Sequence, residues 1–81
     1  MIRLGKTAKT KPDVAIQEAK DFFGPKGYGL TMVDETPTWV KFEGSGGEVE
    51  IGAVEEDKGT SVEIVSREWD TQAKEFMSKL R

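Results

Sequence analysis

The chain of 81 residues contains neither cysteine nor histidine. Without cysteine it has no disulfide, no thiolate metal ligand and no thiol nucleophile, and this composition fits an intracellular protein. Without histidine it lacks the most common general base and the most common zinc ligand. An enzyme built from this chain would depend on carboxylates, lysine, tyrosine or a bound cofactor. We therefore expect a non-catalytic protein with no metal site and no cofactor.

Long apolar stretches are also missing. No stretch approaches the roughly 18 residues needed to span a bilayer, and the first residues lack the hydrophobic core of a signal peptide. We expect a cytoplasmic protein that does not contact membranes. The net charge is −3, but residues 1–11 carry four cations and no acid. Four dispersed cations without interleaved aromatic residues are a weak nucleic-acid footprint, so the sequence argues against a nucleic-acid partner.

Alternating apolar and polar residues dominate the second half of the chain. Such alternation is typical of strands with one buried face. It covers residues 28–33, 38–43, 48–54 and 60–66, and a shorter alternation at residues 2–4 predicts a first strand before the polar stretch 6–11. Residues 34–37, 44–47 and 55–59 have the composition of turns.

Two helices are expected. Residues 12–23 carry a broad apolar face; Pro12 suits the first turn, and Gly24 is expected to end the helix as a left-handed cap. The second helix, at residues 71–80, has Asp70 as its expected N-cap, with Trp69 just before it. Its apolar stripe is Trp69, Ala73, Phe76, Met77 and Leu80.

The element order β-α-β-β-β-β-α predicts a single α+β domain, residues 1–81. Consecutive strands joined by short loops form an antiparallel meander, and we expect the first strand to pair with the last, in the order 1-5-4-3-2. Both helices are expected on one face of the sheet. Val40 and Phe42 are predicted to point inward and Trp39 outward, while the opposite register, with Trp39 on the side of Met32, stays open.

This element order resembles the helix-grip proteins and the related half-repeat of TATA-box-binding proteins, in which a curved sheet grips a C-terminal helix. Residues 42–47, Phe-Glu-Gly-Ser-Gly-Gly, are similar to the glycine-rich hairpin loop of helix-grip plant allergens. The resemblance covers nearly the whole chain and implies an apolar ligand between the sheet and the last helix. The chain lacks the additional strands and the small helix of the full-length members.

Two groups of residues are candidate binding sites. Large side chains expected between the sheet and the second helix either hold a small apolar ligand or fill the core, as small domains require. They are Tyr28, Met32, Phe42, Trp69 and Phe76. An apolar spot on the open face would suit a protein partner or a second copy of the chain, because exposed tryptophan is a common interface anchor. This spot comprises Val33, Trp39 and Val65.

The acidic residues indicate solubility more than chemistry. Glu55, Glu56 and Asp57 are consecutive, whereas a calcium loop needs alternating oxygen ligands. Outward glutamates on the strands, including Glu50 and Glu63, would repel phosphates. We therefore expect a small binding or interaction module that acts through the sheet face or the crevice beside the C-terminal helix. The alternative is a carrier of a small apolar ligand.

Overall fold

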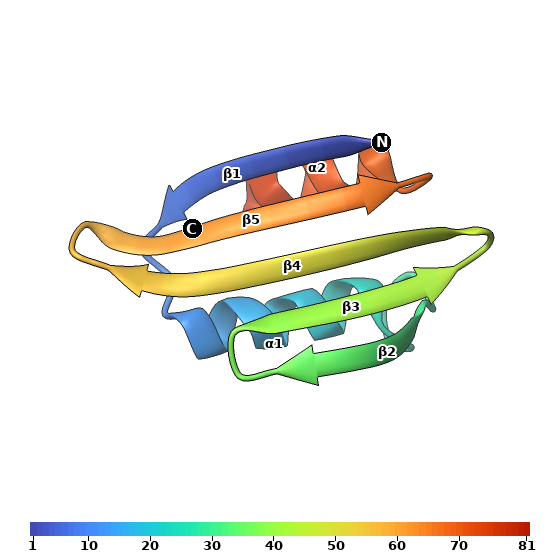
Figure 1. Cartoon of the computed structure of the whole chain (residues 1–81), viewed down its shortest axis with the longest axis horizontal. Helices are drawn as coiled ribbons and strands as arrows, with labels where there is room; N and C mark the ends of the chain where they lie inside the picture. The colour runs from blue at the N-terminus through green and yellow to red at the C-terminus, as the bar shows by residue number, and fades with distance from the viewer.

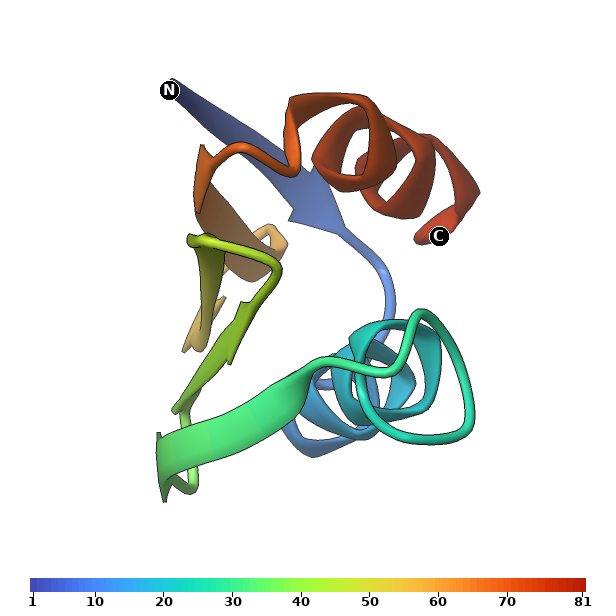
Figure 2. The same ribbon diagram turned by 90° about the vertical axis from the view of Figure 1, so that its right-hand side faces the viewer.

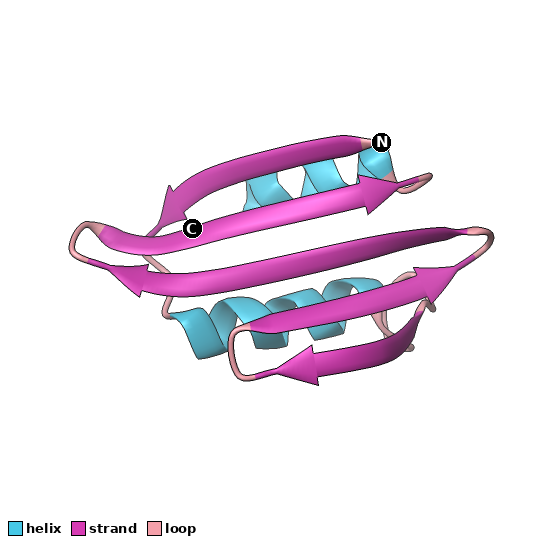
Figure 3. Cartoon of the chain, viewed as in Figure 1, coloured by secondary structure: helices cyan, strands magenta, loops and turns pink.

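The structure, a computed structural model, describes residues 1–81, and its elements follow one another as β-α-β-β-β-β-α (Figures 1 and 3). The elements are β1 (Ile2–Ala8), α1 (Pro12–Phe23), β2 (Thr31–Thr36), β3 (Trp39–Gly44), β4 (Gly47–Glu56), β5 (Gly59–Arg67) and α2 (Asp70–Lys79). The strands form one antiparallel sheet in the order β1-β5-β4-β3-β2. The predicted α+β class and strand order are therefore confirmed.

Both helices lie on the same side of the sheet, as Figure 2 shows. Helix α1 packs over β3 and β4, whereas α2 packs over β5 and β1. The other side of the sheet carries no helix, so its outward side chains remain open to solvent (Figures 1 and 2).

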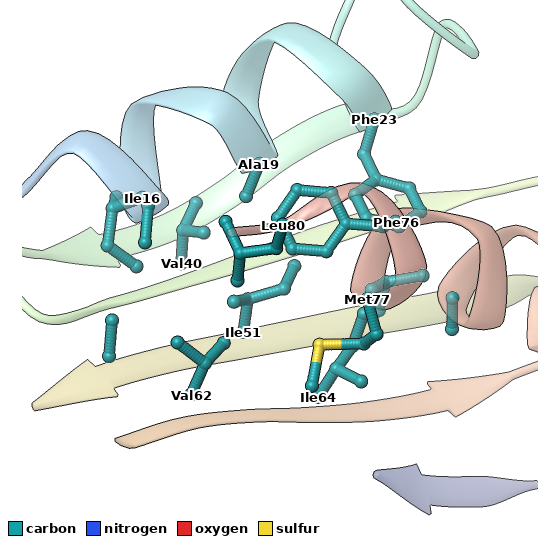
Figure 4. Packing of buried hydrophobic residues seen from close by; sticks show 14 of the residues in the cluster. Ile16, Ala19, Phe23, Val40, Ile51, Val62, Ile64, Phe76, Met77 and Leu80 are labelled. Carbon is teal, nitrogen blue, oxygen red and sulfur yellow. The ribbon is translucent and has the colours of Figure 1, made fainter. Parts of the chain in front are cut away.

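The hydrophobic core fills the space between the sheet and the helices. In Figure 4, Ile51 and Ile64 of the sheet point toward the helices, from which Phe76 and Met77 point back. Both isoleucines are fully buried and Phe76 is 3% exposed, so each contributes roughly 1.5–3 kcal/mol through apolar burial. The predicted inward alternation is confirmed, because a strand places every second side chain on the same face.

Strand β1 is longer than the sequence predicted. It runs to Ala8, which pairs with Thr60, so part of the stretch expected to be a loop belongs to the sheet. Lys6 consequently points inward, where its Nζ donates to Met77 O at 3.0 Å and to Leu80 O at 2.6 Å. These carbonyls at the end of α2 have no partner within the helix, so the ammonium group satisfies them.

Strand β2 begins later than predicted. Of the strand expected at residues 28–33, only residues 28–30 are not part of β2; they fold back on α1, where Tyr28 N donates to Phe22 O at 3.0 Å and Leu30 N to Phe23 O at 2.8 Å. The strand covers Thr31–Thr36, with a bulge at Val33, and the expected turn at 34–37 shrinks to residues 37 and 38.

The predicted helix caps were partly wrong. Gly24 has φ −73° and is not left-handed; it is required because a Cβ there would lie 2.4 Å from Lys20 O. At α2 the N-cap is Trp69 instead of Asp70, since Trp69 O accepts the first helical hydrogen bond, from Ala73 N at 2.9 Å.

Candidate functional site

Trp39 lies on the open face of the sheet. Its neighbours Val40 and Phe42 are 0% and 1% exposed, which excludes the opposite register. Across the ladder Trp39 faces Gly52 of β4, and a Cβ on this glycine would lie 4.0 Å from Trp39 Cδ1. The indole therefore lies over backbone, and no side chain separates it from the sheet.

A hollow of about 340 Å³ opens beside this indole. It extends over four strands, from Trp39 of β3 to Arg3 of β1. Gly52 of β4 pairs with Glu63 of β5. Val65 of β5 lies between Glu50 of β4 and Arg3 of β1 and pairs with both. Gly52 provides a floor without a side chain. Its lining residues are Met1, Arg3, Trp39, Glu50, Gly52, Glu63 and Val65, and we refer to it as the Trp39 hollow.

The two carboxylates of the Trp39 hollow differ in their partners. Arg3 Nη1 donates to Glu63 Oε1 at 2.8 Å, so Glu63 is paired. Glu50 is half-buried and has no cation within 4.0 Å. Lys41 stands directly opposite Glu50 but pairs with Glu43 at 3.8 Å and Glu48 at 3.5 Å.

The open face as a whole is acidic. Register places six carboxylates on it against three cations. The acids are Asp34, Glu43, Glu48, Glu50, Glu56 and Glu63, and the cations are Arg3, Lys41 and Arg67. The face therefore carries a net negative charge at neutral pH.

The predicted apolar spot is only partly assembled. Trp39 and Val65 both line the Trp39 hollow. Val33 does not join them, because the bulge of β2 carries it to a separate hollow beside the glycine-rich turn at residues 44–47. It is 46% exposed there.

On the helix side, four of the five predicted ligand residues belong to a connected aromatic cluster. Phe22 is its centre: its ring centroid lies 5.3 Å from that of Tyr28 and 5.5 Å from that of Phe76. Tyr28 continues to Trp69 at 5.9 Å, and Phe42 joins through Phe23. These edge and tilted contacts are the favoured aromatic geometries.

Met32 lies outside this cluster. It pairs with Phe42 across the ladder, but it is 40% exposed at the edge of the sheet. Of the five predicted ligand residues, the structure therefore brings together four.

The aromatic cluster encloses no ligand space. All four hollows of the molecule open to the surface, and none lies between the sheet and α2. One of these hollows, of about 320 Å³, lies between the two helices, and we call it the interhelical groove. Its apolar floor is formed by Phe22, Phe76 and Leu80, and its charged rim by Glu18, Asp21 and Lys79.

Tyr28 ties the turn after α1 to helix α2. Its hydroxyl donates to Glu75 Oε1 at 2.8 Å. This hydrogen bond raises the pKa of Tyr28 and lowers that of Glu75, because it favours the neutral phenol and the ionised carboxylate. Neither residue lines a hollow, so this pair acts as a tether.

Sequence reasoning missed two contributors to these surfaces. Gly52 interrupts the outward series of β4, but its role depends on facing Trp39, which only the hairpin register shows. Phe22 was expected simply on the apolar face of the first helix. Phe22 lies two residues before Gly24, where the chain turns back. This position is the sequence signal from which the contact between Phe22 and Tyr28 could have been predicted.

No family model, curated protein or solved structure matches this chain. No helix in the structure is long and apolar enough to cross a membrane. The structure gathers no group of three or more acidic side chains that could hold a metal ion.

Proposed function

We propose that this chain is a small non-catalytic interaction module that binds a protein partner through the open face of its sheet. The observation that carries the proposal is the Trp39 hollow: a half-buried tryptophan beside a glycine floor, on a face that no helix covers. Tryptophan supplies a large rigid contact area, and a neighbouring recess lets a partner's side chain reach it.

The lack of the most common general base and of a thiol nucleophile supports a binding role. The sequence holds no histidine or cysteine. The two groups with shifted pKa values, Tyr28 and Glu75, lie on the helix side and away from the Trp39 hollow.

Selection of binding peptides tests the proposal. Random peptides displayed on phage are selected against the immobilised wild type and then measured against Trp39→Ala and a control, Val14→Ala. Val14 is an apolar residue on α1, 46% exposed, so the control removes exposed apolar surface on the helix side of the molecule. We expect the selected peptides to lose binding to Trp39→Ala and to retain it with Val14→Ala.

Folding of the variants is checked by circular dichroism and thermal unfolding, and solution mass at several concentrations detects a second copy as the partner. A set of peptides insensitive to Trp39→Ala would refute the proposal. A selection that yields no peptide binding to this face would also refute the proposal.

A second candidate function is that of a small apolar-ligand carrier, which the resemblance to helix-grip proteins also favours. The observation behind it is the interhelical groove, with its floor of Phe22, Phe76 and Leu80. In a Trp39→Phe variant the remaining tryptophan, Trp69, reports on the aromatic cluster. Apolar ligands that change its fluorescence would favour this candidate, and an unchanged signal would remove it.

A further inference from the structure

We propose that the Trp39 hollow receives the guanidinium group of an arginine on a partner protein other than a second copy of this chain. The inference rests on the proposed function and adds the chemistry that the hollow recognises. It follows from the indole, the free carboxylate of Glu50 and the charge of the surrounding face.

Glu50 supplies the electrostatic reason. It is half-buried beside the indole, and it lacks the ion pair that Glu63 has with Arg3. Covering a carboxylate without a partner costs free energy, whereas a charge-assisted hydrogen bond offsets that cost. An apolar side chain in the hollow would desolvate Glu50, and an anion would be repelled.

Trp39 supplies the preference for a flat cation. A guanidinium stacks on an indole face, holds a carboxylate with two hydrogen bonds and is less strongly hydrated than an ammonium group. The backbone floor at Gly52 leaves room beside the indole. At the opposite wall Arg3 and Glu63 already form an ion pair between a guanidinium and a carboxylate, with one hydrogen bond of 2.8 Å.

The charge of the whole face argues against a second copy. Six carboxylates oppose three cations, so two such faces would repel each other. Arg3 and Arg67, the chain's own arginines on this face, already pair with Glu63 and Glu48. A basic patch on a different protein is complementary to this surface.

The test is a nuclear magnetic resonance titration of the full chain with N-acetyl-arginine amide. N-acetyl-citrulline amide is the neutral control of nearly equal shape, and N-acetyl-leucine amide is the apolar control. The indole resonance of Trp39 reports the hollow, and that of Trp69, on the helix side, is the internal reference. We expect saturable shifts of Trp39 with the arginine compound and none with citrulline.

Matched variants assign the binding to its groups. Glu50→Gln should lower the affinity for the arginine compound roughly tenfold, because a charge-assisted hydrogen bond is lost. Glu56→Gln removes the same charge from the same strand at an exposed site without an ion pair, and it should leave affinity unchanged. Trp39→Leu retains an apolar side chain and should abolish the preference for arginine over leucine; because this variant lacks the indole reporter, the backbone amide of Gly52 in the floor of the hollow is followed instead.

The outcomes separate this inference from the proposed function. If leucine binds at Trp39 as well as arginine, or if Glu50→Gln has no effect, the arginine site is refuted while the interaction face stands. A wild-type dimer that Glu50→Gln dissociates would overturn the assignment to a different protein. If neither these compounds nor the selected peptides touch Trp39, both proposals fail.

Discussion

Replacing Lys6 by methionine tests the link between the edge strand β1 and helix α2. The substitution keeps the apolar stem and removes the ammonium group, which donates to Met77 O and Leu80 O at 3.0 and 2.6 Å. Both carbonyls belong to the C-terminal turn of α2, where the helix dipole favours a cation. The variant therefore removes the cap without opening a cavity.

The structure sets the expected magnitude. A hydrogen bond to a charged group contributes about 1.5–3 kcal/mol when buried, and Lys6 is only half-buried, so water replaces part of the loss. We expect Lys6→Met to lower the free energy of unfolding by about 2 kcal/mol in total. For a chain of 81 residues this corresponds to a fall in Tm of about 8–16 °C.

Urea and thermal unfolding measure the effect, and Lys9→Met is the matched control. Lys9 follows β1, is exposed and has no ion pair or hydrogen bond, so its replacement should change stability by less than about 0.5 kcal/mol. Hydrogen exchange adds a local readout, because the Leu80 amide should lose protection in Lys6→Met. Equal stability of the two variants would refute the capping role.

Two further predictions concern the backbone and the Tyr28 tether. Gly47→Ala should destabilise the fold by about 1–3 kcal/mol, because its Cβ would lie 2.3 Å from Arg67 O, whereas Gly52→Ala meets nothing closer than 3.7 Å and should be tolerated; equal urea midpoints would contradict this. The hydrogen bond from Tyr28 to Glu75 lowers the pKa of the carboxyl in the folded state. The bond therefore stabilises the fold above the carboxyl's unfolded-state pKa of about 4.3, and this stabilisation is lost as the pH falls through the folded-state pKa. The raised pKa of the phenol likewise means that the stabilisation is present below about 10 and is lost as the pH rises through the folded value. The difference in unfolding free energy between wild type and Tyr28→Phe should therefore vanish in acid, and a difference that persists there would contradict the assignment.

Much of the fold was predictable from local patterns. Val40, Val49, Ile51 and Ile64 each have at least one charged residue as a direct neighbour in the chain, and all four are buried. This works because a strand has a period of two residues, so the pattern identifies the buried face before any partner is known. Short turns then force neighbouring strands to pair, and this produces the meander.

The errors arose where tertiary contacts override local preference. Lys6 begins a polar stretch that is typical of a loop. Its contact with the end of α2 could not be predicted from its neighbours, because the two lie more than seventy positions apart in the sequence. Tyr28, Leu30 and Met32 occupy every second position, as the residues on one face of a strand would. The backbone of Tyr28 instead completes the end of α1, because the carbonyl of Phe22 is available there.

The candidate site divides in the same way. The sequence by itself determined that Trp39 lies on the face opposite Val40 and Phe42, and that glutamates occupy alternate positions on the following strands, since both follow from alternation along single strands. It favoured Trp39 on the outer face but left the opposite register open. Only the tertiary structure decided that Trp39 stands over Gly52, that Glu63 is paired with Arg3 and that Glu50 is left without a cation. Those facts depend on the register between strands, which is set by the packing of the whole sheet against its two helices.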